Sequence, residues 1–132
     1  MSISYEATFP PTPLGVGAMR REIAAYAQRV GLDEDGVSDV RLAVSEAATN
    51  AVVHGYRDID GELKVVAYVA DDELVVIVSD TGRGLTPRPD SPGLGLGMPL
   101  MASVTSRFRV MSRGAGTEIH MAFALPNGAA PA

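Results

Sequence analysis

Two helical patterns follow one another before any pair of strands begins, and this order is the strongest constraint on the fold. After three closely spaced prolines, an apolar stripe with helical spacing runs over Leu14–Val30, and Gly31 occupies the position of a C-terminal cap. A second stripe predicts a helix from near Asp33 or Asp35 to about His54, with acidic residues at its positive end. Each helix is apolar on one side only, so both are expected to cover the same hydrophobic surface.

Strand patterns that precede and follow the helices supply that surface. Alternating or largely apolar runs predict the strands Ile3–Phe9, Glu62–Ala70, Glu73–Ser79, Ser106–Ser112 and Thr117–Leu125. The second and third of these are joined by a tight turn of two aspartates and read as a hairpin. The fold class is therefore expected to be α+β: a two-layer sandwich of one mixed, mostly antiparallel sheet with the helices on one face.

The longest connection is a loop rich in proline and glycine over Thr81–Gly97, followed by a short helix at about Met98–Ser103. With 132 residues, the chain is expected to be a single domain over 1–132 with its core at about 3–125. The tail, 126–132, is expected to be disordered.

Composition narrows the functional classes. No segment approaches the roughly 18 consecutive apolar residues of a membrane span, and the N-terminus lacks the basic and apolar regions of a signal peptide. The chain has no cysteine, which fits a reducing compartment, so a cytoplasmic protein without membrane contact is expected. A net charge of −5 argues against nucleic acid as a direct partner, because binding of phosphates needs clustered lysine and arginine.

The second predicted helix carries the first candidate site residues. Glu46 and Asn50 lie one turn apart on the same face, away from the apolar stripe. The amide oxygen of Asn50 suits Mg²⁺, which keeps several waters and takes other oxygens from phosphates. The Glu46 carboxylate can accept a proton from an attacking hydroxyl or water. Taken alone, the pair favours the simpler interpretation that both residues are solvated helix positions.

A second candidate stands where a buried strand ends. Asp80 directly follows the apolar run of the hairpin's second strand and precedes Gly82 and Gly84. An ionised carboxylate only accepts hydrogen bonds, so it suits the amino group of adenine and would repel the carbonyl group of guanine. The glycines let the backbone approach a base closely. An ordinary Asp-Thr-Gly turn is the alternative.

A glycine cluster ahead of the short helix is the third candidate. Gly93, Gly95 and Gly97 offer free backbone N–H groups near the positive end of a helix, where phosphates bind. The cluster is neither a dinucleotide-binding fingerprint nor a P-loop. It predicts a mobile lid over a triphosphate, with a glycine-rich hinge of no function as the alternative.

In order and spacing, these groups resemble the N, G1 and G2 boxes and the terminal threonine of the GHKL (Bergerat-fold) ATP-binding superfamily. The resemblance rests on Glu46-x-x-x-Asn50, Asp80-x-Gly82-x-Gly84, Gly93-x-Gly95-x-Gly97 and Thr117, and it covers about 10–125. Around the N box and the last glycines, the sequence is similar to stand-alone bacterial anti-sigma-factor serine/threonine kinases.

The resemblance implies two cofactors, ATP and Mg²⁺, and a role for each site residue. Asn50 would hold Mg²⁺, Asp80 would read adenine together with Gly84 and, through a water, Thr117, and Glu46 would be the catalytic base. The G1 and G2 glycines, Gly82, Gly84, Gly93, Gly95 and Gly97, would line the nucleotide and the lid. His54 would approach the phosphates or ribose, with a helix-end histidine of no such role as the alternative.

The resemblance also implies partners: a sigma factor that is held inactive, and a STAS-domain anti-sigma-factor antagonist that is phosphorylated. A homodimer is expected through the first strand and helix. Two alternatives remain open, namely an ATP-binding regulatory module without catalysis and a switch kinase of a signalling complex. Glu46 favours catalysis, whereas three prolines in the short lid leave the efficiency of lid closure undecided.

Overall fold

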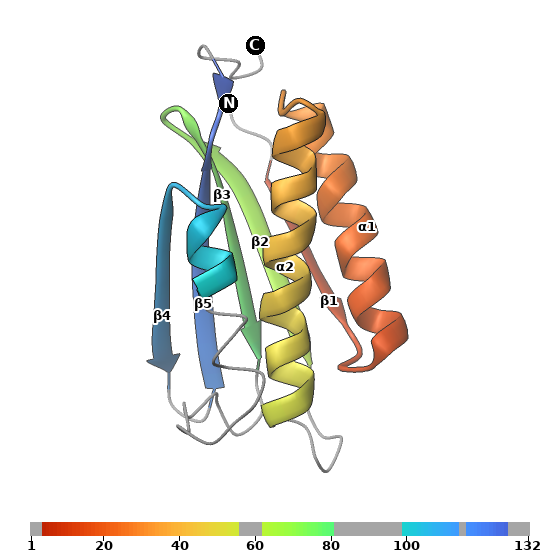
Figure 1. The fold of residues 1–132 in the computed structure, drawn as a ribbon. Coiled ribbons are helices and arrows are strands. Elements are labelled where there is room, and N and C mark those ends of the chain that lie inside the picture. The colour runs from red at the N-terminus through yellow and green to blue at the C-terminus, as the bar shows by residue number, and fades with distance from the viewer. Residues whose placement is uncertain (1–3, 56–61, 81–98, 114–115, 127–132) are drawn as a thin grey trace.

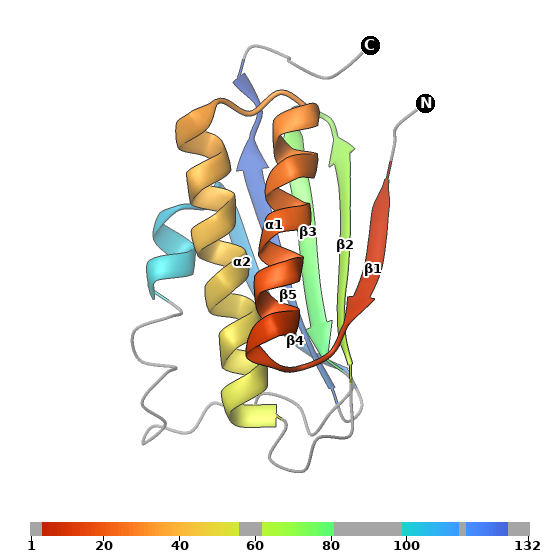
Figure 2. The same ribbon diagram turned by 90° about the vertical axis from the view of Figure 1, so that its right-hand side faces the viewer.

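The computed structural model describes residues 4–55, 62–80, 99–113 and 116–126 of the chain. Within this part, a five-stranded sheet carries both long helices on one of its faces, as Figures 1 and 2 show from two sides. The predicted α+β two-layer sandwich is therefore confirmed. All four strand pairs are antiparallel, so the described sheet contains none of the parallel pairing that a mixed sheet would add.

The elements agree closely with the sequence patterns. In chain order they are β1 (Tyr5–Phe9), α1 (Pro13–Arg29), α2 (Glu34–Gly55), β2 (Leu63–Ala70), β3 (Glu73–Asp80), β4 (Arg107–Arg113) and β5 (Gly116–Ala124). A short helix over 99–103 precedes β4. The predicted lid at 81–97 and most of the predicted disordered tail lie outside the described residues.

Local capping explains where the two long helices begin. Thr12 has extended backbone angles, and its hydroxyl accepts a hydrogen bond of 3.1 Å from the Gly15 N–H, as an N-cap does. Pro13 is the first helical residue, one position before the apolar stripe begins at Leu14, because proline fits the first turn, where its missing N–H is not needed. At the start of α2, the Asp33 carboxylate accepts from the Gly36 N–H at 2.8 Å.

Non-local pairing sets the order of the strands, β1-β2-β3-β5-β4. The β2–β3 hairpin turns at Asp71, whose φ of 55° lies in the left-handed region that aspartate tolerates. The last strand, β5, lies between β3 and β4, so the C-terminal part of the chain completes the centre of the sheet.

The core lies between the helices and one face of the sheet. Cross-strand pairs of β3 and β5 such as Val76 with Met121 and Val78 with Ile119 point toward α1 and α2 and are almost fully buried. Met19 and Ile23 of α1 meet them from the other layer. Burial of each such side chain contributes about 1.5–3 kcal/mol, which makes this layer the main source of stability.

No helix in the described part of the chain is long and apolar enough to cross a membrane. The face of the sheet that points away from α1 and α2 carries no described helix, as Figure 2 shows from the side.

Candidate functional site

The buried face of the sheet changes from apolar to polar at one end. On β3 the row of helix-facing residues runs through Leu74, Val76 and Val78 to Asp80. On β5 the matching row ends in Thr117, which is the direct cross-strand partner of Asp80. Directly opposed residues of an antiparallel pair have Cβ atoms about 4.5–5.5 Å apart, so the carboxylate and the hydroxyl are neighbours on one face.

Both polar residues are nearly inaccessible. Asp80 is 5% exposed and Thr117 is 2% exposed, and they are the buried polar or charged residues of the described chain. A carboxylate at an ordinary turn lies in water, whereas burial of a charge is costly unless polar partners compensate for it. Burial in the row of core residues therefore distinguishes Asp80 from a simple turn aspartate and favours a specific role.

Helix α2 brings Glu46 to the same layer. The helix contacts both β3 and β5 on the face that carries Asp80 and Thr117. Glu46 is half-buried, and its neighbours Ala43 and Ala47 on the helix are fully buried in the core. Glu46 therefore lies at the border between the core and the surface, with part of its side chain accessible.

The end of α2 lies where β3 ends and β5 begins, as Figures 1 and 2 show. Asn50 and His54 belong to the last turns of this helix, which places them at the Asp80 end of the molecule. A helix C-terminus carries a partial negative charge, and Asp80 adds a carboxylate at the same end. This end of the molecule therefore favours a ligand that brings a cation or N–H donors.

The structure thus brings Glu46, Asp80 and Thr117 into one layer and places the backbone of Asn50 and His54 at its polar end. The five candidate glycines, Gly82, Gly84, Gly93, Gly95 and Gly97, lie outside the described residues. So do the side-chain positions of Asn50 and His54. Among described residues, no group of three or more His, Asp or Glu side chains is arranged to hold a metal ion.

The sequence matches the histidine kinase-like ATPase domain over residues 9–123, which covers the helices and strands that build this site. Three curated relatives align with most of the chain. The anti-sigma F factor of Clostridium acetobutylicum is 35% identical over 114 residues, which is 77% of this chain and 80% of the relative. The serine-protein kinase RsbW of Bacillus velezensis is 35% identical over 133 residues, covering 88% and 83%. The RsbW of Bacillus subtilis is 34% identical over 128 residues, covering 85% and 80%.

A solved structure shares the fold. The structure of the RsbU and RsbW domains of Rv1364c from Mycobacterium tuberculosis superposes with a TM-score of 0.75 at 24% identity. The match covers 93% of this chain and 32% of that one. With the domain match spanning most of the sequence and relatives above 30% identity, the chain belongs to the histidine kinase-like ATPase domain family.

Proposed function

We propose that this protein is an ATP-dependent serine/threonine protein kinase that acts as an anti-sigma factor. It would bind a sigma factor and hold it inactive. It would also phosphorylate a STAS-domain protein that antagonises this inhibition. The observation that carries the proposal is the buried Asp80–Thr117 pair at the polar end of the sheet, next to a helix that bears Glu46. Relatives named anti-sigma F factor and serine-protein kinase, at about a third identity, support the same role.

Asp80 and Thr117 fit the recognition of a base better than the recognition of phosphate. A carboxylate accepts hydrogen bonds and repels phosphate oxygens, whereas the adenine amino group donates. The adjoining Thr117 hydroxyl both donates and accepts, so it can hold a water between the protein and the ring. Gly82 and Gly84 would bring backbone to the other edge of the base, and Gly93, Gly95 and Gly97 would hold the phosphates.

Mg²⁺ would be held by the amide oxygen of Asn50 together with phosphate oxygens of the nucleotide. Bound there, the ion would neutralise the charge that develops on the transferred phosphoryl group. The negative end of α2 and the Asp80 carboxylate favour such a cation at this end of the fold. Such a site does not need a full coordination shell of protein side chains, because Mg²⁺ commonly uses one or two protein ligands and keeps several waters.

Glu46 would orient and deprotonate the hydroxyl group of the substrate. Half burial suits this work, because the carboxylate keeps contact with an incoming side chain while its surroundings hold it in place. Its position one helical turn before Asn50 sets the base beside the proposed metal ligand. His54, a turn further on, would approach the phosphates or the ribose.

The decisive experiment incubates the purified protein with ATP labelled on the γ-phosphate, Mg²⁺ and a candidate STAS-domain protein. Transfer of label to a serine or threonine of that protein is expected. In parallel, binding of a candidate sigma factor is measured with and without ATP. A regulatory module without catalysis would bind ATP and the sigma factor but label nothing. A switch kinase of another signalling complex would label its substrate and not bind the sigma factor.

A homodimer through β1 and α1 remains a separate part of the proposal. Light scattering at several protein concentrations tests it, because a monomer throughout would contradict it.

A further inference from the structure

The two margins of the sheet differ in how much of them is covered. β1 forms one margin and β4 the other, as Figure 1 shows. β1 is five residues long, and the ring of Tyr5 lies 5.9 Å from that of Tyr26, which holds the strand against α1. β4 is seven residues long and pairs only with β5 in the part of the chain that the structure describes. Among the described strands, the other edge of β4 therefore presents backbone N–H and C=O groups without a strand partner.

The core-facing rows of side chains lose their cover at β4. Phe108 lies opposite Met121 of β5, and Val110 lies opposite Ile119. The two β5 residues are at most 2% exposed, whereas Phe108 and Val110 are only partly buried. A further strand beside β4 would bury more of both side chains, and such burial stabilises by about 25 cal/mol per Å² of apolar surface.

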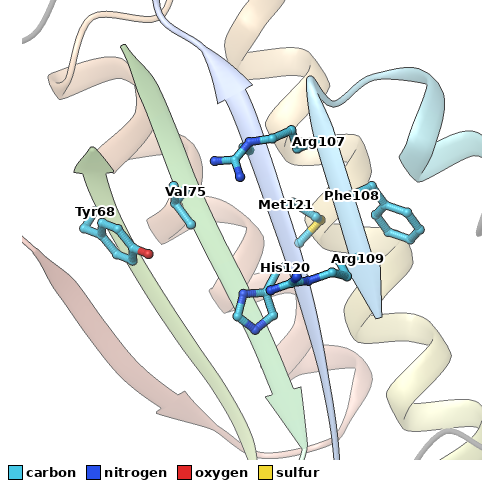
Figure 3. A pocket seen from close by; sticks show the side chains of 8 residues that line it. Tyr68, Val75, Arg107, Phe108, Arg109, His120 and Met121 are labelled. Atoms are coloured by element: carbon cyan, nitrogen blue, oxygen red, sulfur yellow. The ribbon is translucent and has the colours of Figure 1, made fainter. Parts of the chain in front are cut away.

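The opposite face of β4 is cationic. Alternation along the strand assigns Arg107, Arg109 and Arg113 to the face that points away from the long helices. In Figure 3, Arg107 and Arg109 project to one side of β4 and Phe108 to the other. Arg107 pairs with Glu73, whereas the exposed Arg109 forms no ion pair with any described side chain. A strand beside β4 would therefore meet positive charge on this face.

A second copy of β4 is a poor partner for this edge. Two copies related by a twofold axis would pair antiparallel, with residues of the same face opposite each other. Full overlap sets Arg107 opposite the other copy's Arg113, and the adjacent registers set Arg109 opposite the other copy's Arg109 or Arg113. Like charges directly opposite each other destabilise a strand pair, and natural sheet edges use charge to avoid self-association.

Protection against self-association explains the arginines but not the other face of β4. A strand that only avoids pairing can carry charge on its inward face as well. Here the core side keeps Phe108 and Val110 partly accessible. An open backbone edge with a cationic face and an apolar face matches a strand in which acidic and apolar residues alternate.

We propose that the free edge of β4 accepts an extended segment of a partner protein in which acidic and apolar residues alternate. The backbone of this segment continues the sheet by hydrogen bonds, which is one of the recurring ways in which proteins bind peptides. Its apolar side chains cover Phe108 and Val110, and its carboxylates lie on the arginine face, where one pairs with Arg109. The edge is separate from the proposed nucleotide site, because no residue assigned to that site belongs to β4.

The test uses the full chain labelled with ¹⁵N and two peptides of seven residues, the length of β4. One peptide alternates glutamate with valine, and the other alternates lysine with valine. The glutamate peptide is expected to shift the amide signals of Phe108, Arg109 and Val110, and to bind at least about fivefold more tightly than the lysine peptide. In Arg109→Glu this preference should disappear or reverse.

Two further peptides test the role of the backbone. Both have the glutamate–valine sequence, with N-methyl groups on the valines in one and on the glutamates in the other. Alternate residues of a strand point their N–H groups to opposite edges, so one methylated peptide should lose binding and the other should bind like the unmodified peptide. Equal behaviour of the two methylated peptides would overturn the proposal, because strand addition uses only one edge of the segment.

A matched variant, Arg21→Glu, makes the same charge change on the exposed surface of α1 and should leave the preference for glutamate unchanged. The proposal is also overturned if neither unmodified peptide shifts the β4 signals, or if Arg109→Glu keeps the original preference. Movement of the β4 signals with protein concentration, when no peptide is present, would contradict it as well, since the edge would then pair copies of the chain. None of these outcomes depends on kinase activity.

Discussion

Asp80 on β3 and Thr117 on β5 face each other directly across the sheet, both buried, at the end of a row that is otherwise hydrophobic. The next pair in the row, Val78 with Ile119, belongs to the core. The polar pair therefore lies where the hydrophobic row ends, at the edge of the proposed nucleotide site. Because its position is fixed by the ladder of the two central strands, the carboxylate is held in a defined orientation before any ligand arrives.

Replacement of the Asp80 carboxylate should weaken ATP binding and leave the fold intact. In Asp80→Asn the acceptor-only group becomes an amide that both donates and accepts. A hydrogen bond to a charged group is worth about 1.5–3 kcal/mol, so affinity for ATP should fall about tenfold or more. Discrimination against GTP should fall as well, because the amide can donate to the guanine carbonyl. Calorimetric titrations with both nucleotides measure the two effects.

The control for this substitution is Asp72→Asn, which removes an exposed carboxylate from the hairpin turn at the other end of β3. Its nucleotide affinities should match those of the wild type. Equal ATP affinity in Asp80→Asn and wild type would remove Asp80 from the base-recognition role.

Loss of the Glu46 carboxylate should separate binding from catalysis. In Glu46→Gln the side chain keeps its size and loses its basicity, so ATP affinity should stay within about twofold. General-base catalysis typically contributes 10²–10⁴-fold, and transfer of label to a STAS-domain substrate should therefore fall by at least about 100-fold. Single-turnover labelling measures this rate without interference from product release.

Glu34→Gln is the matched control for that experiment, because it makes the same change at an exposed position in the first turn of α2. It should retain full transfer activity. Undiminished transfer in Glu46→Gln would show that another group accepts the proton.

The Glu73–Arg107 ion pair should make a small, pH-dependent contribution to stability. Hydrogen bonds from Arg107 and then from Ser106 hold the pKa of Glu73 below its ordinary value of 4.5. A carboxyl group whose pKa is lower in the folded state stabilises the protein above its unfolded-state pKa. This contribution is lost as the pH falls through the folded-state pKa. Because the Arg107 side chain is exposed and water screens its charge, the effect should be small.

Urea unfolding between pH 3 and 7 tests this contribution. The free energy of unfolding should fall more steeply with acid in the wild type than in Glu73→Gln. Arg107→Ala should reduce the same part of the pH dependence, and the double variant should lose little more than either single change. Parallel curves for the wild type and Glu73→Gln would show that the pair does not contribute.

Local patterns were sufficient to predict most of the architecture. Helical periodicity located α1 and α2, and the two aspartates at 71 and 72 located the β2–β3 turn. Alternation along β3 and β5 also predicts the residues of the buried row, because side chains two positions apart share a face. These features depend on contacts between residues close in sequence.

The remaining features depend on residues far apart in the chain. Insertion of β5 between β3 and β4 is what places Thr117 opposite Asp80, and neither strand's pattern specifies that partner.

The first turns of α1 contain a contact that no sequence pattern reveals, and it leads to opposite predictions for two glycines. A Cβ atom at Gly15 would lie 1.9 Å from the Pro10 carbonyl oxygen, whereas one at Gly17 would meet only the Arg21 guanidinium at an ordinary 3.6 Å. Gly15→Ala should therefore destabilise the protein by at least about 2 kcal/mol, since backbone must move to relieve the overlap. Gly17→Ala should stabilise it by up to about 1 kcal/mol, because alanine is the better helix former. Urea unfolding of the two variants compares them directly, and similar midpoints would contradict the close approach of α1 to the β1–α1 connection.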